Sequence, residues 1–238
     1  MIPISDDVPS RTMPFITIGL IAANVLVYFY QALLGSGADP QAAHVVEAFV
    51  TEFGAIPCRL SGSCALADQF PHPFVTIFTA MFLHGGLFHV GGNMLYLWIF
   101  GNNVEDTLGH GRFLLFYLVS GVAAAFAQTL VNPASTVPMI GASGAVSGVL
   151  GAYLLLFPYA RVLVLLIFGF FIRPVYVPAL IVLGFWIVVQ FVNGLITVRA
   201  SALGGAETGG TAWFAHIGGF LAGIVLLFLM RRRPGGRL

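Results

Sequence analysis

The sequence has very little charge and contains no lysine. Charged residues make up 8% of its 238 residues, hydrophobic residues make up 58%, and the mean hydropathy is +0.96. Soluble domains carry roughly 25% charged residues, so a surface this poor in charge would not stay dissolved. The net charge of +1 offers no basic face for nucleic acid. The composition predicts an integral protein of the lipid bilayer with no nucleic-acid partner.

The chain also lacks the signatures of several membrane enzymes and carriers. There is no His-Glu-x-x-His motif, and His84 and His89 are five residues apart, off a common helical face, without a neighbouring acid. No long apolar segment carries the aspartates of an aspartyl protease. The charged residues expected along a transport pathway are missing from these segments too. We therefore expect no metal site and no cofactor.

Six apolar segments are long enough to cross a bilayer as helices, which takes about 20 residues each. These predicted spans cover residues 14–34, 86–104, 113–131, 141–157, 175–197 and 211–230. The apolar stretch 162–172 is too short to span, and we expect it to form part of a loop at the cytoplasmic interface. The predicted fold of residues 1–238 is a single-domain, all-α polytopic membrane protein of six transmembrane helices. A long extracytoplasmic loop, about 35–85, would follow the first span.

Arginine positions predict how the chain is oriented in the membrane. If both termini lie inside, the outer segments hold only Arg59 and Arg199. The inner segments then hold the other eight arginines: Arg11, Arg112, Arg161, Arg173, Arg231, Arg232, Arg233 and Arg237. Positive residues are enriched on the cytoplasmic side of membrane proteins. We expect a multi-pass protein of the bacterial cytoplasmic membrane with both termini in the cytoplasm.

Four polar residues stand out because polar groups are costly inside a membrane. His89 and Asn93 lie early in the second span, Ser143 starts the fourth, and His216 lies early in the sixth. These three spans run in the same direction, so their first turns share one depth. His89 and Asn93 are four residues apart and therefore face the same way on a helix. The sequence predicts that all four side chains converge in the outer leaflet.

This set of residue types indicates nucleophilic catalysis. A serine hydroxyl is a weak nucleophile until a base such as imidazole accepts its proton, which Ser143 and His216 could achieve without a third carboxylate. Backbone N–H groups at the start of a helix have no intrahelical acceptor, and those near Ser143 would suit an oxyanion. His89 and Asn93 could add side-chain donors there. Taken alone, however, a serine after glycine in a membrane helix is usually a packing residue.

Small residues recur at four-residue spacing beside both proposed catalytic residues. They are Gly144, Gly148 and Ala152 in the fourth span, and Ala215, Gly219 and Gly223 in the sixth. Such spacing lets two helices approach closely, which would bring Ser143 within hydrogen-bonding reach of His216. The pattern is common in membrane bundles, so its position beside the dyad is what gives it weight.

Four short motifs carry a resemblance to a known family. They are His-Gly-Gly-Leu-Phe-His at 84–89 with Asn93, Gly-x-x-x-Glu-x-x-x-Gly at 101–109, Gly-Ala-Ser-Gly-Ala at 141–145, and Ala-His-Ile-Gly-Gly at 215–219 followed by Gly223. In content and order they resemble the motifs of the rhomboid intramembrane serine proteases. The resemblance implies a six-helix core around a water-accessible cavity, with Ser143 as nucleophile, His216 as base, and His89 and Asn93 in the oxyanion hole.

The resemblance also implies partners and moving parts. Substrates would be single-span or polytopic membrane proteins, with the fifth helix and the loop before the sixth as gate and cap. Some rhomboids carry a tyrosine under the catalytic histidine where this chain has Ser147. Either another ring, such as one from the Phe-rich spans, supports His216, or the base is held more loosely. A catalytically silent binding protein would be expected to lose the serine or histidine, and this chain keeps both. Nothing predicts an oligomeric state.

Cys58 and Cys64 are the only cysteines, and both fall in the long first loop. Disulfides persist in extracytoplasmic compartments, and the Ser-Gly-Ser turn between them could bring the sulfurs together. We expect a disulfide, with two unpaired thiols as the alternative. A metal site is disfavoured because no paired Cys or His ligands flank them.

Overall fold

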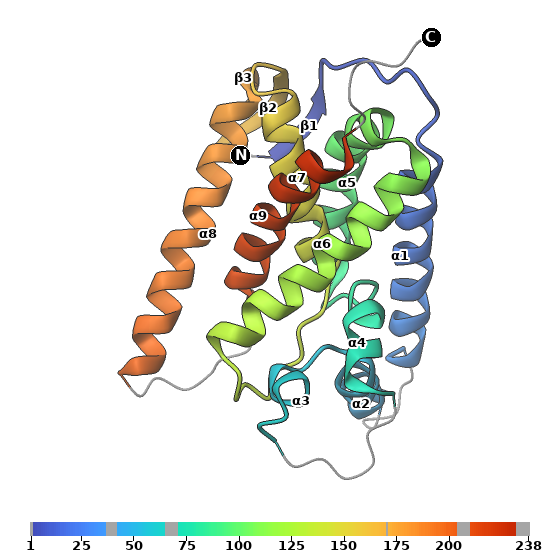
Figure 1. Ribbon diagram of the computed structural model, residues 1–238, viewed down its shortest axis with the longest axis vertical. Helices are drawn as coiled ribbons and strands as arrows, with labels where there is room; N and C mark the ends of the chain where they lie inside the picture. Colours follow the sequence, from blue (N-terminus) through green and yellow to red (C-terminus); the bar gives the residue numbers. More distant parts are fainter. Residues whose placement is uncertain (1, 37–41, 65–70, 170, 204–209, 232–238) are drawn as a thin grey trace.

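The computed structural model describes residues 2–36, 42–64, 71–169, 171–203 and 210–231 (Figure 1). Long helices lie side by side, and a small sheet covers one end of them. The elements are β1 (Ile2–Asp6), α1 (Phe15–Leu34), α2 (Ala42–Phe53), α3 (Pro57–Ser61), α4 (Pro73–Ala80), α5 (Leu87–Leu108), α6 (His110–Val131), α7 (Ser143–Leu156), β2 (Arg161–Phe168), β3 (Phe171–Pro178), α8 (Ala179–Ala202) and α9 (Trp213–Met230).

The helical, multi-pass membrane architecture predicted from the sequence is confirmed. Among the described residues, four helices are long and apolar enough to cross a membrane: α1, α6, α8 and α9. The shorter helix α7 has 14 residues and is also apolar, while α5 is long but carries polar residues such as Asn93, Asn103 and Glu105. The count of six spans, and the single-domain organisation, remain predictions.

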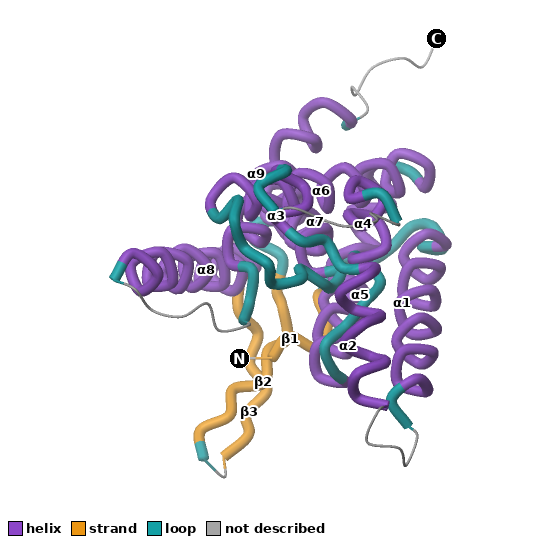
Figure 2. Tube along the Cα trace, turned by 90° about the horizontal axis from the view of Figure 1, so that it is seen from below, coloured by secondary structure: helices purple, strands orange, loops and turns teal. Residues whose placement is uncertain are grey.

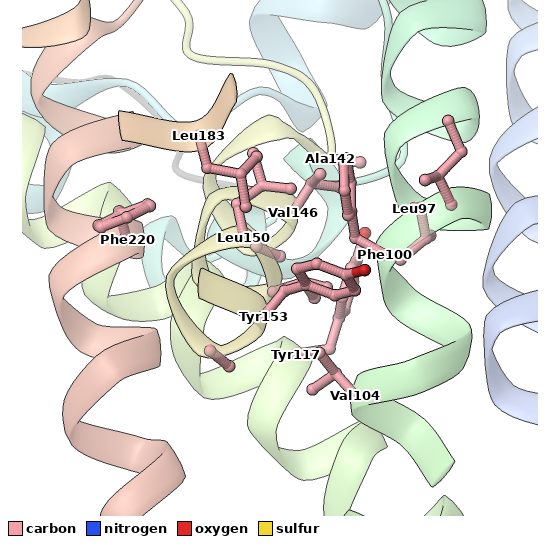
Figure 3. Close-up of a cluster of buried hydrophobic side chains, with 14 of the residues drawn as sticks. Leu97, Phe100, Val104, Tyr117, Ala142, Val146, Leu150, Tyr153, Leu183 and Phe220 are labelled. Carbon is pink, nitrogen blue, oxygen red and sulfur yellow. The ribbon is translucent and has the colours of Figure 1, made fainter. Parts of the chain in front are cut away.

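Helix α7 forms the centre of the bundle. It packs against α5, α6, α8 and α9, and its residues 145–153 are all buried. Small residues such as Gly144, Gly148 and Gly151 let the neighbouring helices pack closely around it. Figure 3 shows the resulting core, where side chains of α7 lie among those of α5, α8 and α9. The labelled core residues of these four helices include Leu97, Phe100, Val104, Val146, Leu150, Tyr153, Leu183 and Phe220.

Glycines let α7 and α9 approach until their backbones touch. A Cβ added at Gly219 would collide with the carbonyl oxygen of Gly144, and one at Gly223 would collide with that of Gly148. Gly148 is also closed in from its other side, because a Cβ there would meet the Ser120 hydroxyl of α6. Only a residue without a side chain allows this separation. The contact fixes the first turns of α7 and α9 beside each other.

The apolar stretch 162–172, which we expected to be part of a loop, lies within a β-hairpin formed by β2 and β3. The sequence analysis did not predict these strands. β2 pairs antiparallel with β3, and β1 pairs antiparallel with β2, in the order β1-β2-β3. Branched and aromatic residues favour strands, and Pro174 sits in β3, an edge strand where a missing N–H is tolerated. Helix α8, which corresponds to the fifth predicted span, therefore begins at Ala179 rather than at Val175.

A buried carboxylate ties the ends of three helices together near the sheet. Glu105 is fully buried, and its Oε2 accepts from the N–H and the hydroxyl of Thr17 at 2.8 and 2.7 Å. Its Oε1 accepts from the N–H of Ile16 at 2.9 Å and contacts His110 Nδ1 at 2.6 Å. The first N–H groups of a helix lack intrahelical acceptors, and a carboxylate satisfies them well. Glu105 thus holds the start of α1 against the junction of α5 and α6.

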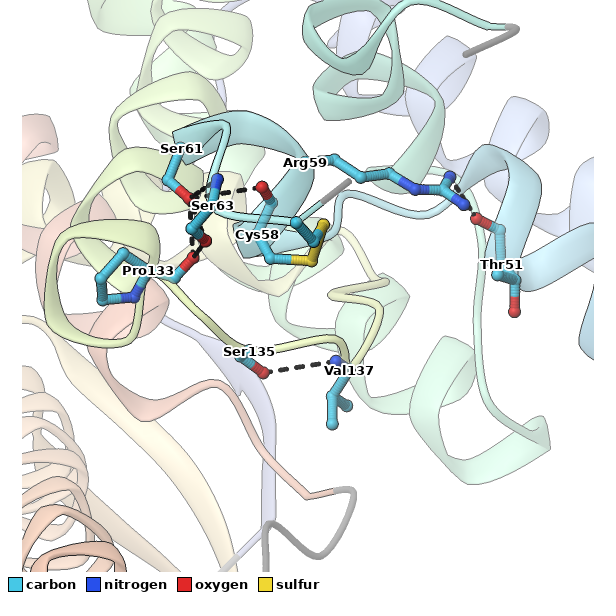
Figure 4. Close-up of a disulfide and its surroundings, with 9 residues drawn as sticks. Thr51, Cys58, Arg59, Ser61, Ser63, Pro133, Ser135 and Val137 are labelled. Carbon is cyan, nitrogen blue, oxygen red and sulfur yellow. Dashed lines mark hydrogen bonds between the residues drawn. A yellow bond between two sulfur atoms is a disulfide. The ribbon is translucent and has the colours of Figure 1, made fainter. Parts of the chain in front are cut away.

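The first loop folds into α2, α3 and α4, which lie at the end of the bundle opposite the sheet (Figure 1). Figure 2 views the molecule from the end that these helices occupy. Cys58 and Cys64 form a disulfide with Cα atoms 5.2 Å apart. Figure 4 shows the hydroxyls of Ser61 and Ser63 donating to the carbonyl of Pro133 at 2.7 and 2.6 Å. The disulfide loop therefore docks at the start of the connection between α6 and α7, at Pro133, ten residues before Ser143.

Two predicted features lie outside the described residues. They are most of the proposed cytoplasmic tail, which includes Arg232, Arg233 and Arg237, and part of the proposed cap, residues 204–209.

Candidate active site

The structure brings Ser143 and His216 into direct contact. Ser143 is the first residue of α7, and His216 lies in the first turn of α9. His216 Nε2 is 2.8 Å from Ser143 Oγ, within hydrogen-bonding distance. Both residues are only partly buried, so the pair reaches the molecular surface. Neither side chain has to move for a proton to pass between them.

The start of α9 is held by a residue that the sequence analysis did not single out. Gln128 of α6 accepts hydrogen bonds through Oε1 from the backbone N–H groups of Phe214 and Ala215, at 3.1 and 3.3 Å. The helix does not satisfy the N–H of Phe214 internally, and that of Ala215 is shared between Gln128 and the Ala212 carbonyl, 3.0 Å away. Gln128 therefore caps α9 from a neighbouring helix and fixes the backbone that carries His216.

Asn93 and His89 lie on the side of α5 that faces the turn before α7. Gly141, in that turn, has φ of 116°, and a Cβ there would lie 2.7 Å from His89 Nε2 and 3.6 Å from Asn93 Nδ2. Only glycine is comfortable at this φ, and only glycine leaves the space free. The two side chains thus converge on the segment that leads into Ser143, as the shared depth of the spans predicted.

The polar atoms of these two residues differ in how they are satisfied. Asn93 is 8% exposed, and its buried Nδ2 has no hydrogen-bond partner among the described residues. His89 Nδ1 accepts from the N–H of Gly85 at 3.3 Å. Because Nδ1 accepts, the neutral ring carries its proton on Nε2, the nitrogen that faces Gly141. Asn93 Nδ2 and His89 Nε2 are therefore donors available to a ligand.

His216 is surrounded by side chains of α8 that the sequence analysis did not identify. Gln190 Oε1 lies 2.8 Å from His216 Nδ1, the ring nitrogen that does not face Ser143. Trp186 lies alongside the imidazole, with ring centroids 5.9 Å apart and planes inclined by 34°. Trp213, also close to the imidazole, stands edge-on to it at 6.4 Å. Of the two alternatives left open by the sequence, the structure shows another ring beside His216, and that ring is Trp186 of α8, within the fifth predicted span.

Ser147, at the position where some rhomboids have tyrosine, takes a different role. Its hydroxyl donates to the carbonyl of Ser143 at 2.6 Å and the side chain is buried. It faces back along its own helix, so the space beside the imidazole is left to Trp186.

The arrangement contains the parts needed for acyl transfer. It has a hydroxyl within hydrogen-bonding distance of an imidazole base, an acceptor on the other nitrogen of that base, and free donors that face the turn leading into the hydroxyl-bearing residue. Among the described residues, no group of three or more His, Cys, Asp or Glu side chains could hold a metal ion.

Comparison with known proteins identifies relatives that share these segments. Residues 71–233 match the family model of the Rhomboid domain. The chain is 33% identical over 156 residues to Rhomboid protein 1, mitochondrial, of Saccharomyces cerevisiae, which is 63% of this chain and 40% of that protein. It is 27% identical over 235 residues to RHOMBOID-like protein 1 of Arabidopsis thaliana, which is 93% of this chain and 54% of that protein.

A bacterial relative matches over a shorter segment. Rhomboid protease GluP of Bacillus subtilis is 44% identical over 78 residues, which is 33% of this chain and 15% of that protein. The chain thus spans about half or less of the length of these curated relatives.

Proposed function

The chain belongs to the rhomboid family, and we propose that it is an intramembrane serine endopeptidase that cleaves other membrane proteins. The observation that carries this proposal is the 2.8 Å contact between Ser143 Oγ and His216 Nε2. A catalytically silent member that only binds membrane proteins would have no use for a serine hydroxyl placed against an imidazole.

The geometry supports a two-step acyl transfer. Ser143 Oγ attacks the carbonyl carbon of the scissile peptide bond while His216 Nε2 takes the hydroxyl proton. When the C–N bond breaks, the imidazolium returns that proton to the leaving nitrogen. A water molecule, deprotonated by the same imidazole, then attacks the acyl-enzyme and releases a carboxylic acid and free Ser143. The partial exposure of both residues leaves room for this water.

Charge that develops on the carbonyl oxygen needs donors that are already in place. The buried Nδ2 of Asn93 has no partner, and His89 Nε2 faces the same turn. The N–H groups in the first turn of α7, which a helix cannot satisfy internally, would add to the set at the positive end of the helix dipole. A preformed donor that waits without a partner is what oxyanion stabilisation requires, because no reorganisation is then needed during the reaction.

The proposed substrates are single-span or polytopic proteins whose transmembrane segments reach the site through the bilayer. Most of the exposed residues described in α8 are large and apolar, including Ile181, Phe185, Val188 and Leu195. Such a surface suits lipid or a substrate helix. The arginine distribution supports an orientation with both termini in the cytoplasm, and the membrane proposed is the bacterial cytoplasmic membrane.

The test is labelling with a serine-reactive fluorophosphonate, followed by cleavage of labelled single-span membrane proteins. We expect the full-length protein in detergent or liposomes to label at Ser143 and to cleave at least one such substrate. Ser143→Ala should do neither while keeping the same thermal unfolding temperature. Equal labelling of both proteins, or cleavage by purified Ser143→Ala, would rule out the serine mechanism.

A further inference from the structure

We infer that Gln190 of α8 is a positioning residue that holds His216 in the tautomer and orientation needed for catalysis. The inference rests on the proposed protease function and adds to it a third side chain, from a helix outside the three that carry Ser143, His216, His89 and Asn93. Gln190 lies in the fifth predicted span, and none of the four motifs of the sequence includes it.

The contact is specific to one nitrogen of the imidazole. Gln190 Oε1 is 2.8 Å from His216 Nδ1, whereas Nε2 faces Ser143. For Nε2 to accept the serine proton, the neutral ring must carry its own proton on Nδ1. A carbonyl oxygen facing Nδ1 can only accept, so it selects that tautomer and fixes the rotation of the ring.

The amide of Gln190 is itself oriented. Its Nε2 donates to the backbone carbonyl of Trp186 at 3.2 Å, one turn earlier in α8. With the nitrogen engaged there, the oxygen is the atom that remains for His216. The side chain is 5% exposed, so water does not compete for the contact. A continuous chain of hydrogen bonds therefore runs from the Trp186 carbonyl through the Gln190 amide and the His216 imidazole to the Ser143 hydroxyl.

A neutral acceptor suits this location. In soluble serine proteases the residue behind the histidine is a carboxylate, but burying an unpaired negative charge inside a bilayer is costly. An amide oxygen orients the imidazole without that cost, although it stabilises the imidazolium less. We therefore expect Gln190 to contribute less to the rate than a carboxylate does in a soluble triad.

Asn193 shows that a side-chain hydrogen bond to the carbonyl one turn earlier does not by itself place an amide against His216. Asn193 lies on the same helix, and its Nδ2 donates to the carbonyl of Val189 at 2.9 Å, again one turn earlier. Of these two amides, the structure places only that of Gln190 against His216. Asn193 is therefore a matched control, with the same chemistry and the same helical bond but without the contact to the base.

The face of α8 that carries Gln190 is the one that meets α9. Trp186, Gln190 and Gly194 are spaced by four residues and lie on one side of the helix. Trp186 contacts the rings of His216 and Phe220, and a Cβ at Gly194 would approach the ring of Phe214 to 3.3 Å. The Gln190 oxygen thus reaches His216 because α8 packs against α9. The imidazole is held in its orientation only while these two helices are in contact.

The experiment measures how fast a fluorophosphonate labels Ser143 in the full-length protein, separating the saturating rate kinact from the apparent affinity KI. Gln190→Met keeps the length but removes the acceptor, and we expect kinact to fall on the order of tenfold, the effect of one hydrogen bond, with KI unchanged. Gln190→Asn, one methylene shorter, should lose a similar amount. Gln190→Glu keeps an acceptor and should restore kinact to the wild-type value or above. The control Asn193→Leu should match wild type.

Several outcomes would overturn the inference. They are equal kinact for Gln190→Met and Asn193→Leu, a change confined to KI, or no recovery in Gln190→Glu. If Gln190→Met unfolds, the comparison of Gln190→Asn with Gln190→Glu still decides, because both keep a polar side chain. Failure of the proposed function gives a different result, namely wild-type protein that does not label or labelling that persists in Ser143→Ala.

Discussion

Helix α5 carries two buried polar residues at different levels, Glu105 and Asn93, and their surroundings satisfy them in opposite ways. Near the sheet, both oxygens of Glu105 are occupied by donors from α1 and α6. Near the start of α7, Asn93 presents a buried Nδ2 that has no partner among the described residues. Both residues lie on α5, and both are almost inaccessible to solvent.

The difference separates what holds the fold from what performs chemistry. A buried carboxylate with four hydrogen bonds recovers the free energy lost on leaving water, so it can stabilise helix packing. A buried donor without a partner costs free energy in the resting protein, and that cost is recovered only when an acceptor arrives. The first residue should therefore control stability and the second should control rate.

The largest expected effect is loss of the base. His216→Ala should lower cleavage by on the order of 10⁴-fold or more, because Ser143 Oγ then has no proton acceptor. The double variant Ser143→Ala/His216→Ala should be little worse than either single variant, since the two residues act as a unit. The measurement is kcat on a labelled membrane substrate. Losses that multiply in the double variant would show that the two residues work independently.

Asn93→Ala should have the next largest effect, also on rate. We expect kcat to fall on the order of 10²–10³-fold with little change in KM, because one oxyanion donor is lost. Thermal stability should change little, since the Nδ2 that is removed has no partner among the described residues. Ser120→Ala is the control, because Ser120 Oγ is also buried without a partner among the described residues but lies on α6 against Gly148. An effect on KM alone would instead place Asn93 in substrate binding.

Glu105→Gln should show the opposite pattern. Exchange of one carboxylate oxygen for an NH₂ group breaks hydrogen bonds to α1 or His110, and we expect the free energy of unfolding to fall by about 2–3 kcal/mol. Cleavage per folded molecule at low temperature should be unchanged. The control is Asp106→Asn, whose exposed bonds to Arg11 and Thr12 should be worth less than about 1 kcal/mol. Thermal unfolding in detergent compares the two, and equal losses would contradict the role of Glu105.

The smallest effect is expected at the disulfide. Replacing Cys58 and Cys64 by serine should lower stability by at most ~2 kcal/mol, because the bridge closes a short loop. The dyad should stay active, since the bridge contacts the connection before α7 rather than the site itself. Reduction of the wild-type protein should reproduce the shift. Free-thiol labelling of both cysteines in denatured, unreduced protein would show that no bridge forms.

The helical bundle and the convergence of Ser143, His216, His89 and Asn93 could be predicted because membrane length and topology restrict the possibilities. Once the spans and their directions are known, polar residues in the first turns of alternate spans must share a depth. The hairpin was missed because 162–172 is apolar throughout. Hydropathy alone does not distinguish a short interfacial helix or loop from a strand pair, and the partner strand β1 lies at the far end of the sequence.

Gln128 and Gln190 were missed for another reason. A glutamine in an apolar span is itself a signal, since buried amides need partners. The shared depth of the polar residues was predicted only for the three spans that run in one direction. Gln128 and Gln190 lie on α6 and α8, which run in the opposite direction. Their depth could be found only by counting from the opposite ends of their helices. The identity of the ring beside His216 depends on packing between α8 and α9, which the sequence does not specify.

The pairing of β1 with β2 has a consequence for the order in which the chain assembles. β1 precedes the other described elements along the chain, yet Asp7 Oδ1, just after β1, accepts from the N–H of Arg161, 154 residues further along. Contacts between residues so far apart form late, because the loop between them must first be ordered. Asp6 likewise accepts a hydrogen bond from the hydroxyl of Tyr153, near the end of α7, which cannot form until that helix is present. The N-terminal strand therefore closes the sheet only after α1 to α7 have been made, and its pairing marks completion of this part of the fold rather than its beginning.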